Sequence, residues 1–387
     1  MAKYKDIVLV FLIAFLYHTM NQMFVPTLPL YITGLGGNEA VVGALVGFIS
    51  LGAIFAKVVF GKMSTRYSNL LVLRIGLVTA TFVLFLYQPF WGFGFLALVR
   101  LIQSIGLAGF LTGIQGMISE QSHAHNRGMF FGIFSAMAGL GMTAGPVLGS
   151  FLAERFDYST LFWTASLIVG FAMVLSFVIK EKPAALAPGM GRKYQPHSPW
   201  KNPDLLVVSG CMLLGATYMG ATSSMLALHA QAAGIANPGL FFGIFALVFT
   251  AGGAISGPLS DRFGRSALII PGFGLLIAGL LCLSMLNGFV MLSVSAVLCG
   301  IGFALVNTVL MTMVPGYSKN PIDVSNDLAF FSNAFDLGVV LGSIGLSWLA
   351  AYSFGLFWLA VALVNAAGLV LFLRFNPEKR QKTKAQV

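Results

Sequence analysis

Long apolar runs separated by short polar segments dominate this chain. Each of twelve runs reaches the length of about 20 residues that a helix needs to cross a bilayer. They lie at residues 6–33, 39–60, 70–88, 91–119, 128–153, 159–180, 204–230, 239–258, 267–286, 289–315, 324–350 and 353–375. The runs are continuously apolar, whereas the strands of a membrane barrel alternate between apolar and polar positions over about ten residues. The pattern therefore predicts an all-α membrane protein with twelve transmembrane helices.

The composition agrees with this prediction, and the positions of the charges orient the chain. Only 9% of the residues are charged and the mean hydropathy is +0.89, whereas a soluble domain carries roughly 25% charge. With a cytoplasmic N-terminus and alternating spans, nineteen of the 22 Lys and Arg residues fall in cytoplasmic segments; Arg155 lies outside, and Lys57 and Arg100 lie within spans. Because positive loops stay inside, we expect a multi-pass protein of the cell inner (cytoplasmic) membrane with both termini in the cytoplasm.

The net charge of +10 does not indicate a nucleic-acid partner, because the basic residues are spread over the cytoplasmic loops. The basic tail that follows Arg374 is expected to meet anionic lipid headgroups. We expect a monomer in the lipid bilayer, with a small molecule as its partner and protons as the coupling ion.

Sequence motifs of catalysis are missing from the chain. It has no GxxxxGK[ST], HExxH or GxSxG motif, so we expect no enzymatic activity, and no ATP site within the chain to supply energy. The cysteines lie in apolar spans without CxxC spacing, which favours packing over disulfides. His123, His125 and His197 lie in cytoplasmic loops with no cluster of acidic residues or cysteines, so no metal and no cofactor are expected.

Two halves of the chain echo each other. Gly61–Ser68 (GKMSTRYS) aligns with Gly257–Gly264 (GPLSDRFG) at an offset of 196, and an offset of 197 pairs Gly141 and Gly145 with Gly338 and Gly342. A duplicated chain with many spans is typical of a transporter that rocks two halves about a central site. A segment rich in Pro, Gly and charge separates the halves. We therefore predict a six-helix bundle at 1–180, a cytoplasmic linker at 181–203, a second bundle at 204–376 and a basic tail at 377–387.

The segment from Gly257 to Arg265 (GPLSDRFGR) resembles the loop signature G-x-L-x-D-R-x-G-R of the major facilitator superfamily, and it lies between the second and third helices of a half, as in that family. The resemblance implies the fold of that family, with two pseudo-symmetric six-helix halves. It also implies a gate that locks the outward-facing state through Gly257, Asp261, Arg262, Gly264 and Arg265. We expect Gly257 to allow close helix contact and Asp261 to pair with a basic residue or cap a neighbouring helix.

The first copy of this signature departs from the family pattern. Thr65, Ser68 and Asn69 stand where the family has Asp, Gly and Arg, so only Gly61 and Arg66 carry over. Whether this first loop acts in gating is left open.

Arg100, Gln103 and Gly106 resemble the fourth-helix signature R-x-x-Q-G-x-G of the same family, with Ser104 in place of its first Gly. An arginine in a span is expensive and needs a partner or water. Arg100 and Gln103 are three residues apart and therefore share a helix face. The resemblance implies that Arg100 helps proton exchange; the alternative is an arginine that snorkels to the outer interface.

In the fifth span, Gly141, Gly145, Pro146 and Gly149 resemble the G-x-x-x-G-P-x-x-G signature of exporters in the superfamily, although Ser150 replaces the final Gly. Glycines spaced by four make a flat face for close packing, and Pro146 removes one backbone hydrogen bond and permits a bend. The resemblance favours export over uptake.

Polar residues within apolar spans are the candidates for a substrate cavity, because burying them without partners is costly. His18, Asn21 and Gln22 lie at i, i+3 and i+4 on one face of the first span. The other candidates for the cavity are Gln103, Gln115, Tyr218, Ser223, Ser224, Asn307 and Asn333.

Asp336 is the carboxylate that lies deepest in an apolar run, about twelve residues from either end. It is a candidate for proton exchange, with a structural Asp as the alternative. His18 is a second titratable candidate, because the imidazole titrates near neutral pH; a neutral, hydrogen-bonded histidine is the alternative. The first span has no acidic residue after Asp6, which weakens a direct transfer of the family's coupling scheme.

The leading interpretation is a proton-coupled exporter of a small organic molecule such as a drug, a metabolite or a metallophore-like compound. An importer or facilitator for a sugar or another metabolite is the second. A lipid or glycolipid flippase, which lateral apolar openings would favour, is the third. A sensor or scaffold without transport is the fourth, but the sequence has no large soluble domain.

Overall fold

The structure, a computed structural model, describes residues 2–121, 127–180, 198–235, 237–318 and 321–378. Within these ranges the chain is helical, without β-strands. The described residues contain twelve helical segments that are long and apolar enough to cross a membrane. The fold class predicted from the apolar runs is therefore confirmed. The predicted linker, apart from residues 198–203, and the basic tail from Lys379 lie outside the described residues.

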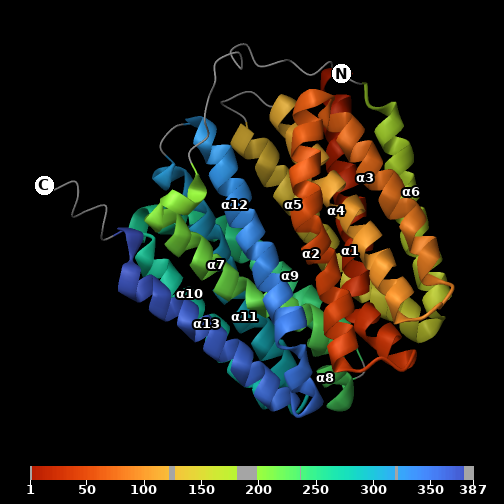
Figure 1. The fold of residues 1–387 in the computed structure, drawn as a ribbon, viewed down its shortest axis with the longest axis vertical. Helices are drawn as coiled ribbons and strands as arrows, with labels where there is room; N and C mark the ends of the chain where they lie inside the picture. Colours follow the sequence, from red (N-terminus) through yellow and green to blue (C-terminus); the bar gives the residue numbers. More distant parts are fainter. Residues whose placement is uncertain (1, 122–126, 181–197, 236, 319–320, 379–387) are drawn as a thin grey trace, which may run out of the picture. The chain divides into compact units, whose positions relative to one another are not determined.

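Contacts divide the chain into two units, residues 1–191 with 237–243, and residues 192–236 with 244–387. The first unit holds α1 to α6, coloured red to yellow-green in Figure 1. Their bounds are α1 Ala2–Gly34, α2 Glu39–Arg66, α3 Asn69–Val83, α4 Phe93–Gln121, α5 Arg127–Arg155 and α6 Tyr158–Val178, with a 3-10 turn, η1, at Leu84–Tyr87 after α3.

The helices that follow run from green to blue in Figure 1. Their bounds are α7 Pro203–Ala221, α8 Ala227–Ala232, α9 Gly239–Phe263, α10 Ser266–Ser284, α11 Phe289–Tyr317, α12 Pro321–Val340 and α13 Phe354–Phe375. A 3-10 turn at Pro199–Lys201 (η2) precedes α7. The first residues of α9 belong to the first unit and the rest of α9 to the second.

Three predicted spans differ from a continuous α-helix, and the third of the twelve is one of them, because it ends in the 3-10 turn η1. The seventh widens into a π-helix at Thr222–Leu226 (η3) before α8. The eleventh passes from α12 into a π-helix at Leu341–Gly345 (η4) and a 3-10 helix at Ser347–Ala351 (η5). In both π segments a serine hydroxyl donates to a carbonyl four residues earlier, from Ser224 to Gly220 and from Ser343 to Val339. Such bonds compete for backbone acceptors and disturb helix geometry, which a hydropathy pattern does not report.

The signature segments also differ from the predicted loops, because most of each is helical. α2 continues to Arg66, and the N–H of Tyr67 closes it on the carbonyl of Met63. α9 continues to Phe263, and only Gly264, with φ of 88°, and Arg265 make the turn into α10. Polar residues can extend a helix beyond its apolar part, because its i to i−4 hydrogen bonds do not depend on lipid.

Glycines set the close helix contacts within each unit. In the first, α1 packs on α5 and α3 packs on α4; in the second, α7 packs on α12 and α10 packs on α11. A Cβ at Gly113 of α4 would collide with the backbone of Leu73 on α3, and one at Gly302 of α11 would lie 2.6 Å from the amide nitrogen of Leu276 on α10. The same helix pairs therefore meet through glycine in both repeats.

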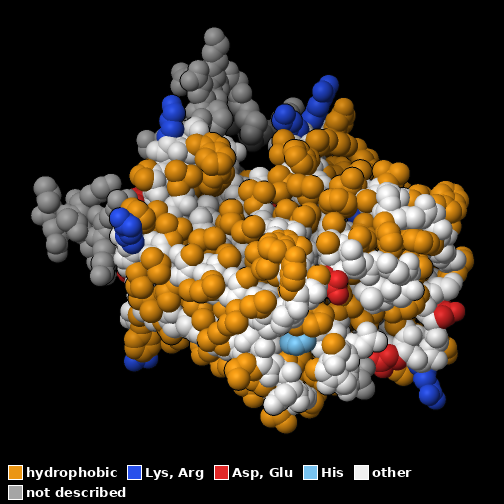
Figure 2. Space-filling view, turned by 60° about the horizontal axis from the view of Figure 1, so that its bottom comes forward, with side chains coloured by type: hydrophobic (Ala, Val, Ile, Leu, Met, Phe, Trp, Pro, Cys, Tyr) orange, Lys and Arg blue, Asp and Glu red, His pale blue; other side chains and the backbone are white. Residues whose placement is uncertain are grey.

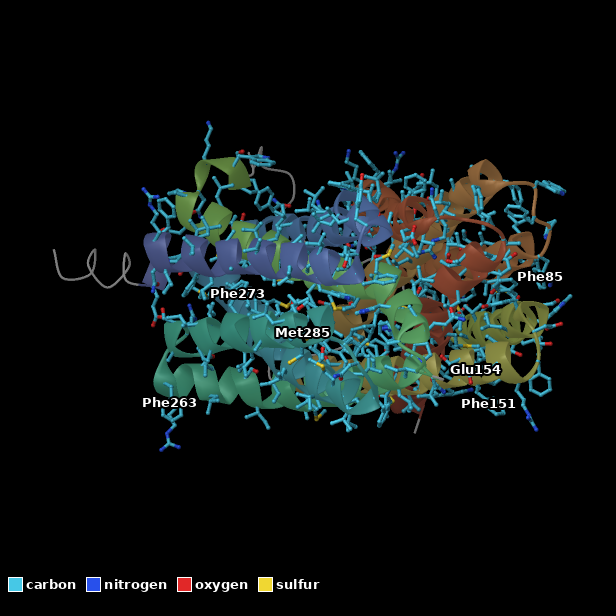
Figure 3. The ribbon with its side chains drawn as sticks, turned by 90° about the horizontal axis from the view of Figure 1, so that it is seen from below. Phe85, Phe151, Glu154, Phe263, Phe273 and Met285 are labelled. Atoms are coloured by element: carbon cyan, nitrogen blue, oxygen red, sulfur yellow. The ribbon has the colours of Figure 1, made fainter. Side chains whose placement is uncertain are left out.

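The surface and the interior are both apolar, as expected for a membrane protein. Figure 2 shows one face on which hydrophobic side chains cover most of the area and Lys and Arg side chains stand at the margins. In the second unit, Phe273 of α10 is fully buried and lies among the helices, whereas Phe263 at the end of α9 is exposed (Figure 3).

Candidate functional site

The polar face of α1 lies among aromatic side chains of its own bundle. The ring of His18 meets Phe110 of α4 edge-on at a centroid distance of 5.6 Å and Phe134 of α5 at 6.2 Å. Next to it, Tyr17 stacks on Phe110 at 3.6 Å. The Nε2 atom of His18 is buried and has no hydrogen-bond partner within the described part of the chain. A buried polar atom without a partner costs free energy, so this nitrogen lacks a compensating contact in the described structure.

The glycines of the exporter-type signature lie against this polar face. A Cβ at Gly141 would lie 2.9 Å from the Cβ of His18, and one at Gly145 would lie 2.8 Å from the Cβ of Gln22. A Cβ at Gly149 would collide with the carbonyl oxygen of Met23, and Pro146 is buried within the same stretch of α5. Two sets of residues that the sequence places far apart, the polar stripe of α1 and the glycines of α5, are thus brought together. Asn21, one residue from this contact, is half-buried.

Arg100 makes all its recorded hydrogen bonds to neutral acceptors of its own bundle. Its Nε donates to the carbonyl of Leu45 (2.7 Å), its Nη2 to that of Val46 (3.1 Å), and its Nη1 to Oε1 of Gln103 (2.8 Å). The side chain is only 5% exposed, so it does not snorkel. Carbonyl dipoles of α2 and one amide oxygen compensate its charge, as a buried ion requires.

Two tyrosines extend this network, and the sequence analysis did not identify them. The hydroxyl of Tyr87 donates to the same Oε1 of Gln103 at 2.5 Å, and the hydroxyl of Tyr31 donates to the backbone carbonyl of Tyr87 at 2.7 Å. The only sequence signal was that a tyrosine inside an apolar span needs a partner for its hydroxyl.

The candidates of the second unit surround an aromatic cluster. The ring of Tyr218 on α7 lies 5.6 Å from that of Phe245 and 5.9 Å from that of Phe303, and its hydroxyl lies beside the thiol of Cys299. Phe303 in turn meets Phe335 of α12 at 6.4 Å, directly before Asp336 in sequence.

Asp336 is buried, with 6% exposure, and the side chains of Asn333 on α12 and Asn307 on α11 are half-buried. A second buried carboxylate on α12, Asp327, escaped the sequence analysis because it lies near the end of its apolar run. It is 1% exposed and accepts a 2.7 Å hydrogen bond from the hydroxyl of Ser318.

Three of the remaining candidates lie apart from these clusters. The side chain of Gln115 on α4 is exposed, and that of Ser223 is half-buried in η3. Ser224 is buried and donates to carbonyls of its own helix.

The first signature segment is held by polar contacts within the first unit. Thr65, which replaces the acidic residue of the family, donates to the carbonyl of Lys62 at 2.9 Å. Ser68 caps α3 by accepting from the N–H of Leu71 at 3.0 Å. Asn69 donates to Oε1 of Glu120, at the end of α4, at 2.7 Å and accepts from Ser64.

The second signature segment exposes Arg262, whose guanidinium lies 5.3 Å from the ring centroid of Phe263. Arg265 is half-buried, and the side chain of Asp261 lies outside the described residues. The expectation of close helix contact at Gly257 was wrong: a Cβ there would meet nothing within 4 Å, and the same holds at Gly61. Arg66 at the end of α2 is exposed beside the ring of Tyr67.

No group of three or more His, Cys, Asp or Glu side chains that could hold a metal ion occurs among the residues that the structure describes. His123, His125 and His197 lie outside them. The three cysteines are free thiols, two of them buried.

Known proteins resemble the chain in sequence and in fold. A family model described as Major Facilitator Superfamily matches residues 10–238 and 230–387. The quinolone resistance protein NorA of Staphylococcus aureus is 26% identical over 192 residues, which cover 50% of this chain and 49% of NorA, so this match spans about half the length of that relative. The multidrug resistance protein MdtG of Klebsiella pneumoniae (strain 342) is 27% identical over 390 residues, which cover 95% of this chain and 91% of MdtG.

Among solved structures, a point mutant of the nucleoside transporter NupG superposes with a TM-score of 0.83 at 16% identity, over 95% of this chain and 99% of that one. This likeness shows the fold alone. The twelve helices, the repeated glycine contacts and the family match over nearly the whole chain agree, and the chain belongs to the major facilitator superfamily of transporters.

Proposed function

We propose that this protein is a secondary active exporter of small organic molecules that exchanges its cargo for protons by alternating access. The observation that carries the proposal is the match to the multidrug resistance protein MdtG over 95% of this chain. The partial match to the quinolone resistance protein NorA points the same way. A drug-like, largely apolar compound is therefore the proposed cargo.

The glycine contact between α1 and α5 supports export as the direction. It consists of the residues of the exporter-type signature, and it packs directly under His18 and Gln22 of the polar stripe on α1. We propose that His18, Asn21 and Gln22 in the first unit, and Tyr218, Asn307 and Asn333 in the second, contact the cargo. Aromatic neighbours of both sets offer flat apolar surfaces, which suit a planar aromatic compound.

Coupling to protons is proposed for Asp336, because an acidic side chain buried in an apolar span can exchange a proton at low cost when its surroundings change. His18 is proposed as a second proton acceptor, since its Nε2 is buried without a partner in the described structure. Arg100 is proposed to act indirectly, by fixing α4 against α2 through the carbonyls of Leu45 and Val46.

The proposal is tested by transport into proteoliposomes of known protein orientation with an imposed pH gradient. The probes are a fluoroquinolone, a lipophilic organic cation, a nucleoside, a sugar and a labelled lipid. We expect the quinolone or the cation to move from the cytoplasmic face of the protein to the other face, in the direction opposite to proton flow. This movement should stop when an ionophore collapses the gradient. Uptake of the nucleoside or sugar in the opposite direction would instead identify an importer, and movement of a labelled lipid alone would identify a flippase.

A further inference from the structure

The helix that follows the second signature segment has no cap of its own. The first residue before α10, Arg265, has helical backbone angles and makes no side-chain capping bond. The equivalent helix of the first repeat, α3, has a capping residue directly before it. There, Ser68 precedes α3 and accepts from the N–H of Leu71. The repeat offset of 196 pairs Ser68 with Gly264, which has no side chain and a positive φ of 88° that favours glycine.

A residue from the far end of the chain supplies the missing cap. Oε2 of Glu378, three residues beyond the end of α13, accepts from the N–H of Ser266 at 2.9 Å and from its hydroxyl at 2.6 Å. A carboxylate at a helix N-terminus satisfies an orphan donor and interacts favourably with the helix dipole. Glu378 thus does for α10 what Ser68 does for α3, but from a distance of 112 residues in sequence.

Asn376 fixes Glu378 in this position. It is 6% exposed, and its Nδ2 donates to the hydroxyl of Ser266 at 3.0 Å, while its Oδ1 accepts from the N–H of Glu378 at 3.1 Å. Ser266 is therefore held by both residues. We call Asn376 and Glu378 the C-terminal clasp.

The clasp belongs to a packed corner that includes the signature arginine. Tyr317 at the end of α11 lies within electrostatic reach of Arg265, Asp204 and Glu378. The carbonyl of Tyr317 accepts from Nδ2 of Asn202 at 2.8 Å, at the start of α7. The ends of α7, α10, α11 and α13 thus meet around the turn that carries Arg265.

We propose that the C-terminal clasp is a conformational device that holds the second signature turn, so that the chain segment after α13 controls this turn and, through it, the transport cycle. In the first repeat, Ser68 caps α3 locally. Gly264 stands where the first repeat has Ser68, and Arg265, which directly precedes α10, makes no side-chain cap. The device is separate from cargo selection and does not rest on which compound is carried.

The test compares Glu378→Ala and Glu378→Gln with wild type in the full chain, by hydrogen exchange and by transport of whichever probe the wild type moves. Removing a charge-assisted cap with two hydrogen bonds is expected to speed exchange of the first amides of α10 about tenfold. Glu378→Gln keeps an acceptor oxygen without the charge, so its exchange rate at α10 should lie between those of wild type and Glu378→Ala. Ser68→Ala is the matched variant and should speed exchange at the start of α3 while leaving α10 as in wild type.

Transport decides whether the clasp controls the cycle or only closes a helix end. We expect Glu378→Ala to change the transport rate by about threefold or more, since a contact that favours one state shifts the balance between states. Faster exchange at α10 with an unchanged transport rate would reduce the clasp to a structural cap. Unchanged exchange at α10 would overturn the proposal whatever transport does, because the carboxylate would then not hold the turn.

Discussion

At the scale of single residues, Arg100 shows how a buried charge is accommodated without a carboxylate. Its three donor groups are divided among two backbone carbonyls of α2 and the side chain of Gln103. Only the planar fork of a guanidinium can serve three acceptors in these directions. The residue therefore fastens α4 to α2 whatever further role it has in transport.

We predict that Arg100→Lys inserts normally but loses thermal stability and most transport. The ammonium group of lysine is a single donor centre, and it cannot reach all three acceptors of the guanidinium. At least one acceptor is then left without its donor, at a cost of about 1–3 kcal/mol for each buried group left unsatisfied. Thermal unfolding in detergent and transport in proteoliposomes measure the two effects. Tyr87→Phe is the control, since it removes one hydrogen bond to Gln103 and leaves the arginine in place. Full activity and stability of the lysine variant would show that the fork geometry is not needed.

The sequence alone predicted part of this network. The spacing of three residues placed Arg100 and Gln103 on one face, and they are hydrogen-bonded. The carbonyls of Leu45 and Val46 were not predictable, because backbone acceptors have no sequence signature and are distinguished only by which helices pack together. The same holds for the contact of Asp327 with the hydroxyl of Ser318, which directly follows α11.

At the scale of helices, the contact of α1 with α5 depends on positions where no side chain fits. A Cβ at Gly145 would lie 2.5 Å from the carbonyl oxygen of Thr19, whereas a Cβ at Gly132 of the same helix would meet nothing within 4 Å. Glycine is thus required at one position and is replaceable at the other. The sequence predicted the close face from the spacing of four, but not which helix would lie against it.

We predict that Gly145→Ala destabilises the protein and that Gly132→Ala does not. The added methyl group forces α1 and α5 apart, and such overpacking costs about 1–3 kcal/mol. At Gly132 the added methyl group meets no neighbouring atom within 4 Å. The higher helix propensity of alanine there increases the stability by about 0.5–1 kcal/mol. Thermal unfolding of the two variants in the same detergent separates the cases. Equal thermal unfolding midpoints for the two variants would mean that α1 and α5 can separate without a cost in stability.

A second helix-level prediction concerns pH at the start of α6. Asp157 accepts a 2.6 Å hydrogen bond from the N–H of Thr160, and its hydrogen bonds to the side chain and backbone of Thr160 lower the pKa of this exposed carboxyl below its usual value. Because the folded-state pKa is lowered, the cap contributes stability above the pKa of the unfolded carboxyl. This contribution is lost as the pH falls through the folded-state value.

An NMR titration of the Asp157 carboxyl should therefore give a pKa below that of a free aspartate, and Thr160→Val should move it back upward by removing the side-chain bond. A pKa in Thr160→Val that equals the wild-type value would assign the shift to the backbone amide alone.

At the scale of the whole molecule, the two repeats share a scaffold but differ in the polar groups that they carry. The carbonyl of Thr19 faces Gly145 in the first unit and that of Thr217 faces Gly342 in the second. This match aligns α1 with α7 at an offset of 198, so that His18, Asn21 and Gln22 correspond to Ala216, Met219 and Gly220. The polar stripe is therefore a property of the first repeat alone.

The repeat was predictable from glycines and apolar runs, because these set the scaffold, and the scaffold is duplicated. The functional asymmetry was visible only as scattered polar residues, because each half places them differently. Asp336 illustrates this, since the offset of 197 that relates α5 to α12 pairs it with Gly139. The position of Asp336 thus carries a titratable group in the second half only.

This asymmetry leads to the prediction that Asp336 couples transport to protons. Asp336→Asn keeps the size and much of the hydrogen bonding of the side chain but cannot exchange a proton. We expect it to abolish accumulation driven by a pH gradient while leaving downhill exchange of the cargo partly intact, measured in proteoliposomes with and without the gradient. Asp327→Asn is the matched control, a buried carboxyl on the same helix whose partner is the hydroxyl of Ser318. It should retain coupling and lose stability instead. If Asp336→Asn still concentrates its cargo with the pH dependence of the wild type, the proton passes elsewhere, and His18, with its buried and unpartnered Nε2 in the described structure, becomes the next group to replace.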